Sequence, residues 1–145
     1  MRDPRQIDLN KALEIHALQR QAALRAASEA NELEIQARRD HDDASRDRDG
    51  MIDFWTQQLE RGAPDPCMLA NFSQVLAVRN DAVREAKKEA EDAQSRTEAE
   101  RLHLAHCEAR RRATSRQANK LRRRNRKRRE EKALLLLELQ VGARR

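Results

Sequence analysis

The sequence has very few large aromatic side chains, since it contains one Trp, two Phe and no Tyr. Such rings usually fill much of a compact interior, so a thick globular core is not expected. Gly and Pro are also scarce, at three residues each, and 39% of the residues are charged. This composition favours long helices over a sheet and predicts an all-α protein. It is also typical of chains that fold only on a partner.

A long apolar run is missing as well, because the longest one covers only residues 133–137. A bilayer-spanning helix needs about 20 such residues, and residues 1–10 are too polar for a secretory signal. We therefore expect a soluble, cytoplasmic protein without direct membrane insertion. In a reducing compartment Cys67 and Cys107 are expected to be free thiols.

Two Asp-Pro pairs, at residues 3–4 and 65–66, are typical of helix starts. Asp can cap a helix N-terminus, and Pro suits the first helical position. Gly62 is suited to close the first helix in a left-handed conformation, whereas Gly50 predicts a bend within it. The chain is thus predicted to be a single domain, a long antiparallel two-helix coiled-coil hairpin. Its parts are a helix over about 4–61, a turn over 62–66 and a helix over about 67–141.

The second predicted helix carries a heptad pattern that starts at Leu69. Thirteen of its 21 seam positions are apolar, against about eight expected from the chain-wide 38%. The first helix has a looser seam of Ala and Leu. The polar residues that interrupt this seam are His16, Arg20, Glu34, His41 and Arg48. Folding at the turn sets Ala30, Ala37 and Ala44 roughly opposite Ala86 and Ala93, where small side chains allow a close approach.

Positive charge is concentrated in residues 109–129, which we call the basic segment. It contains twelve Lys or Arg and no acidic residue, and residues 109–145 carry a net charge of +12 while the other 108 residues sum to −6. Such a segment can bind nucleic acid by counterion release. It lacks the interleaved aromatics that stack on bases, and an acidic protein surface suits it equally well.

Apolar side chains gather at two places. Around the turn they include Phe54, Trp55, Met68, Phe72 and Leu76, which is more bulky surface than two helices can hide from water. Far from the turn, residues 134–137 are expected to lie across from the apolar residues between Ile7 and Leu18. Part of each group is predicted to be a partner surface.

Catalytic and metal-binding patterns are weak in this sequence. His103, His106 and Cys107 are the only cluster of soft ligands, and Cys107 falls on the heptad seam, where packing is the favoured interpretation. A phosphate-binding glycine loop and an ordered nucleophile and base are absent. We expect no enzyme activity, no metal and no cofactor.

A charged helical hairpin with an apolar bend and an apolar joined end resembles the type III secretion stalk proteins of the FliJ and YscO family. The resemblance covers nearly the whole chain in architecture and composition, and it extends to the central stalk of rotary ATPases. It implies a non-enzymatic stalk that inserts its terminal end into a hexameric export ATPase. The bend side would contact the export gate or secretion chaperones. The protein would then lie in the cytoplasm, beside the inner membrane through the export apparatus.

The resemblance assigns residues to both contacts and covers flagellar, virulence and symbiosis systems alike. The ATPase-ring contact would comprise Ile7, Leu13, Arg122, Arg123, Arg124, Arg126, Arg128, Arg129, Leu134, Leu135 and Leu139. The gate or chaperone contact would comprise Phe54, Trp55, Met68, Phe72 and Leu76. Two alternatives remain, a basic coiled coil that binds nucleic acid and a homodimeric coiled-coil scaffold.

Overall fold

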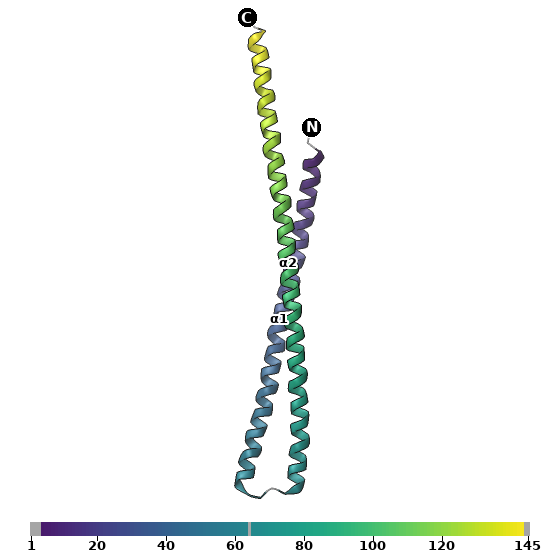
Figure 1. Cartoon of the computed structure of the whole chain (residues 1–145), viewed down its shortest axis with the longest axis vertical. Coiled ribbons are helices and arrows are strands. Elements are labelled where there is room, and N and C mark those ends of the chain that lie inside the picture. The colour runs from purple at the N-terminus through teal and green to yellow at the C-terminus, as the bar shows by residue number, and fades with distance from the viewer. Residues whose placement is uncertain (1–3, 64, 144–145) are drawn as a thin grey trace. The chain divides into compact units, whose positions relative to one another are not determined.

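The computed structural model describes residues 4–63 and 65–143. It contains two α-helices in these ranges, α1 (Pro4–Arg61, 58 residues) and α2 (Pro66–Gly142, 77 residues). Figure 1 shows the short connection that joins them. The predicted all-α fold, a hairpin of two long helices, is confirmed. The helix limits differ from the expected ones by at most one residue, and the expectation of a single domain stays a prediction.

The start of α2 follows the expected capping pattern. The backbone N–H of Cys67 donates to Oδ1 of Asp65 at 3.2 Å, and that of Leu69 donates to the Asp65 carbonyl at 3.1 Å. Asp65 thus satisfies a free N–H group of the first turn, as an N-cap residue does. The left-handed conformation expected at Gly62 is wrong, since no glycine in the described residues has a positive φ. Gly50 does not interrupt α1.

Two compact units divide the helices between them. Unit 1 takes in residues up to Leu24 and from His103 onward, and unit 2 is Arg25–Leu102. Each unit therefore holds one piece of α1 and one piece of α2. The unequal charge follows this division, because unit 2 contains 18 acidic and 12 basic residues while the basic segment belongs to unit 1.

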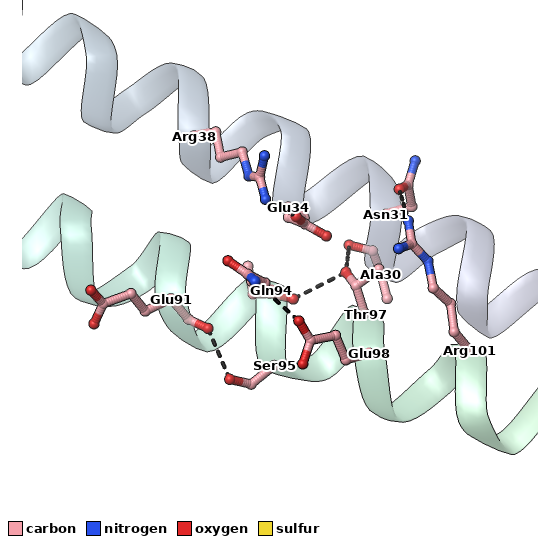
Figure 2. Close-up of polar contacts among 11 residues, drawn as sticks. Ala30, Asn31, Glu34, Arg38, Glu91, Gln94, Ser95, Thr97, Glu98 and Arg101 are labelled. Carbon is pink, nitrogen blue, oxygen red and sulfur yellow. Dashed lines mark hydrogen bonds and ion pairs between the residues drawn. The ribbon is translucent and has the colours of Figure 1, made fainter.

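Contacts within unit 2 fix an antiparallel register. The hydroxyl of Thr97 donates to the Ala30 carbonyl at 3.1 Å, and Nη2 of Arg101 donates to Oδ1 of Asn31 at 3.1 Å (Figure 2). Towards the bend, Arg79 pairs with Asp47. Residues later in α1 pair with residues earlier in α2, so the two helices run antiparallel in this unit. Ala30 thus faces Thr97, whose hydroxyl also lies 3.0 Å from the Ala93 carbonyl, so Ala30 lies within about one helical turn of Ala93.

Contacts within unit 1 continue the same sense of pairing. Nε of Arg20 lies 3.2 Å from Oε1 of Glu108, and Nη2 of Arg122 donates to Oδ1 of Asn10 at 3.3 Å. The most buried apolar side chains here are small ones. They are Ala23, Cys107 and Ala118, with exposed fractions of 3%, 6% and 1%. Small seam residues let two helices approach closely but bury little apolar area.

Polar side chains occupy the seam as well. All five polar residues that interrupt the expected first-helix seam are buried or half-buried. Glu34 is only 9% exposed and pairs with Arg38 at 2.6 Å (Figure 2), while Thr97 is completely buried. The heptad positions were thus located correctly even where their side chains are charged. Polar residues in a seam help to specify one register between the helices, at a cost in hydrophobic packing.

Candidate interaction surfaces

The last part of α2 has no α1 segment beside it in the described residues. The Asn10–Arg122 hydrogen bond lies near the start of α1, and α2 continues past this point to Gly142 (Figure 1). Every residue from 126 to 142 is exposed. We call residues 126–142 the extension. It brings charged and apolar side chains to one unpaired helical surface.

The leucines of the extension are open to solvent. Leu134, Leu135, Leu136, Leu137 and Leu139 have exposed fractions of 61%, 58%, 62%, 57% and 70%. A cluster of apolar side chains this exposed is typical of an interaction surface. It is the largest such run on either helix within the described residues.

The expected packing of these leucines against α1 is wrong. Leu9 instead lines a groove of about 420 Å³ together with Leu121. The reason is the register between the helices, because the first residues of α1 lie beside α2 residues that precede the extension. Ile7 is 41% exposed and Leu13 is half-buried, so neither lies beside Leu135.

The arginines at the dense end of the basic segment are exposed, and few have partners. Arg122 reaches Asn10, and Nε of Arg126 lies 2.8 Å from Oε1 of Glu130 within the extension. For Arg123, Arg124, Arg128 and Arg129 no ion pair occurs within the described residues. The helix therefore presents a dense, solvated positive surface. Whether these residues contact an ATPase ring stays a prediction.

The residues assigned to the gate contact do gather next to the bend. Trp55 lies at the centre, with its ring centroid 5.0 Å from that of Phe72 and 6.1 Å from that of Phe54. Trp55, Phe72 and Leu76 are half-buried, whereas Phe54 and Met68 are 56% and 45% exposed. The half-buried members close the hairpin, and the exposed members remain available to a partner.

A further groove, which the sequence did not point to directly, lies in unit 2. Its volume is about 380 Å³, and it is lined by half-buried alanines, which we call its floor, and by charged side chains, which we call its rim. We call it the alanine groove. The residues that line it are Ala26, Glu29, Ala30, Leu33, Glu89, Asp92, Ala93, Arg96 and Glu100. The expected close approach of Ala30 and Ala93 was the one signal that could have located it.

The candidate metal ligands do not form a site. Sγ of Cys107 lies 3.8 Å from Nε2 of His103, and no group of three possible ligands occurs among the described residues. Neither helix, over its described length, combines the span and apolarity that a membrane crossing requires. Comparisons with protein-family models, curated proteins and solved structures find no match.

Proposed function

We propose that the protein is a non-enzymatic stalk or adaptor of a type III protein export apparatus. The extension and the arginines of the basic segment contact the hexameric export ATPase, and the bend side contacts the export gate or secretion chaperones. The protein acts by differential contacts and has no chemistry of its own. Its place is the cytoplasmic side of a flagellar, virulence or symbiosis secretion system.

The observation that carries this proposal is the unpaired extension. A single helix that presents both leucines and arginines can enter a narrow opening that a paired hairpin would not fit. Its apolar side chains gain about 25 cal/mol per Å² of surface removed from water. The arginines add long-range attraction to an acidic rim, which raises the association rate and falls with ionic strength.

The exposed side chains at the bend support a second contact. Phe54 lies near the end of α1 and Met68 near the start of α2, beside the bend, and Met is suited to irregular apolar surfaces. A groove of about 230 Å³ lies between Trp55 and Met68. Aromatic and Met side chains are enriched at the centres of protein interfaces, so this end suits a protein partner.

The test is the hydrolysis rate of the cognate export ATPase with and without the purified full chain. We expect the chain to raise the rate. Leu135→Ser should raise the concentration needed for half-maximal stimulation by at least about fivefold, since a central interface residue contributes over about 1 kcal/mol. Charge reversal of Arg128 and Arg129 should act in the same direction.

Leu102→Ser is the matched control, because Leu102 is 64% exposed but lies outside the extension. It should leave stimulation unchanged. Absence of stimulation together with absence of co-sedimentation would reject the proposal.

The exposed arginines favour one second candidate, a coiled coil that binds nucleic acid. Only this function requires tight binding of a duplex near physiological salt, with an affinity that falls steeply as salt rises. A mobility-shift titration at several salt concentrations separates the two. Tight duplex binding that is lost on reversal of Arg128 and Arg129, with no ATPase stimulation, would favour the nucleic-acid function.

A further inference from the structure

The rim of the alanine groove carries unpaired negative charge. It has four carboxylates, those of Glu29, Glu89, Asp92 and Glu100, against one cation, Arg96. None of the four forms an ion pair within the described residues, and Glu100 is half-buried. Four carboxylates around a groove with a floor of alanine methyl groups favour a cationic occupant.

The floor of the groove suits a helix. Ala26, Ala30 and Ala93 present only methyl groups, so a third helix can approach the pair closely. The α2 residues along the groove run from 89 to 100, which corresponds to about 16 Å of helix at 1.5 Å per residue. Leu33, 61% exposed, gives one edge of the groove an apolar contact for the incoming helix.

The extension carries a face that matches this groove. Continuing the heptad places Arg128, Lys132, Leu135 and Leu139 on one stripe, which spans the same number of residues as the groove. Arg129 and Leu136 flank the stripe on one side. This face carries three positive charges and three leucines, Glu131 and Glu138 flank it on the other side, and Glu130 lies off it.

The α2 residues of the groove and the extension belong to one continuous helix, Pro66–Gly142. A contact between them within one chain would require this helix to fold back on itself. A second copy brings no such conflict. A basic, apolar helix and an acidic, apolar groove on the same chain are thus complementary only between molecules.

We propose that the extension of one copy lies in the alanine groove of a second copy of this chain. The leucines of the stripe pack on the alanine floor, and Arg128 and Lys132 pair with the carboxylates of the rim. Two copies that exchange extensions form a closed dimer, and one-way docking forms a longer assembly. Either arrangement uses the same contact. The inference does not depend on the proposed function.

The test is sedimentation of the purified full chain over a range of concentrations and salt. The wild-type protein should self-associate, and less strongly at high salt. The groove-reversed variant Glu29→Lys/Glu89→Lys and the extension-reversed variant Arg128→Glu/Lys132→Glu should each associate at least about tenfold more weakly, because like charges then meet. All four residues are exposed, so both variants are expected to fold.

Matched controls change the net charge equally but elsewhere. Glu32→Lys/Glu91→Lys lies outside the groove, and Arg123→Glu/Lys127→Glu lies away from the stripe. Both should associate within about threefold of wild type, since screened charges off the contact contribute little. An effect of the controls as large as that of the variants would mean general charge attraction and would overturn the proposal.

Mixing the two reversed variants tests whether the extension binds the groove of a second copy. A Glu-bearing extension and a Lys-bearing groove are again complementary, so the mixture should associate more strongly than either variant alone. The proposal is wrong if the mixture stays monomeric, or if wild-type protein is monomeric up to about 0.1 mM, a concentration that detects even weak specific contacts.

Discussion

Replacing Thr97 by Val tests whether the buried hydroxyl holds the two helices of unit 2 in register. The Thr97 side chain is completely buried. Its Oγ1 lies 3.1 Å from the Ala30 carbonyl of the other helix and 3.0 Å from the Ala93 carbonyl of its own (Figure 2). A hydroxyl has one proton to donate, so it shares that proton between the two carbonyls. Val keeps the volume and removes the donor.

The magnitude follows from three terms. Loss of one hydrogen bond costs about 0.5–1.5 kcal/mol. Both carbonyls also lie in helices and can accept helical hydrogen bonds, so the larger cost of an unsatisfied buried group does not arise. The new methyl gains up to about 0.8 kcal/mol, but it meets the Ala30 carbonyl at a distance suited to a hydrogen bond, and the crowding offsets that gain. We expect a net loss of about 1 kcal/mol.

Urea denaturation followed by Trp55 fluorescence measures this loss, because the only Trp belongs to unit 2. For a slope of about 2 kcal/mol per molar urea, the midpoint should fall by about 0.5 M with no change in slope. Thr56→Val is the control. Thr56 is exposed, and its hydroxyl bonds only to the Ile52 carbonyl of the same helix, at 2.8 Å.

The control should shift the midpoint by less than about 0.25 M, in line with a surface change within about 0.5 kcal/mol. Equal midpoints for Thr97→Val and Thr56→Val would refute the reasoning. The hydroxyl would then contribute nothing between the helices, and the register of unit 2 would have to come from other contacts.

Two further changes probe the packing of each unit. Ala118→Leu overpacks the most buried seam position of unit 1, which is 1% exposed, and should cost about 1–3 kcal/mol of unfolding free energy, measured by circular dichroism against urea. Ala113→Leu, at an exposed position, should cost close to nothing. In unit 2, Phe72→Leu removes the ring contact with Trp55 and should cost about 0.5–1.5 kcal/mol with a changed Trp emission. Phe54→Leu, at an exposed ring, should cost less, and the reverse order would contradict the assigned packing.

Much of the fold could be predicted from the sequence because its signals are local. Asp65-Pro66 starts a helix through capping and a fixed φ, both properties of two adjacent residues. The heptad also located the seam correctly through Thr97 and Glu34, since a period does not depend on every side chain being apolar. Gly62 was different, because its φ is not positive and its position therefore does not require a glycine.

The candidate surfaces were harder to predict, because they depend on the register between two helices. One register places the apolar end of α2 beside Leu9, and another places it beyond α1. The heptad is compatible with both, since a shift of seven residues keeps the same faces together. Contacts such as Asn10–Arg122 select the second. The same long-range pairing creates the alanine groove, whose lining comes from residues some 60 positions apart in sequence.

The distribution of apolar side chains links this fold to its function. The buried apolar side chains within the described residues are two alanines and one cysteine, while large residues such as Leu135, Leu18 and Val78 are more than half exposed. At about 25 cal/mol per Å², the surface left open represents more unrealised hydrophobic free energy than the small seam residues have realised. A partner that covers the extension therefore gains hydrophobic free energy that the hairpin itself leaves unrealised. Binding to the extension should also raise the stability of the protein, because a ligand that binds only the folded state stabilises it.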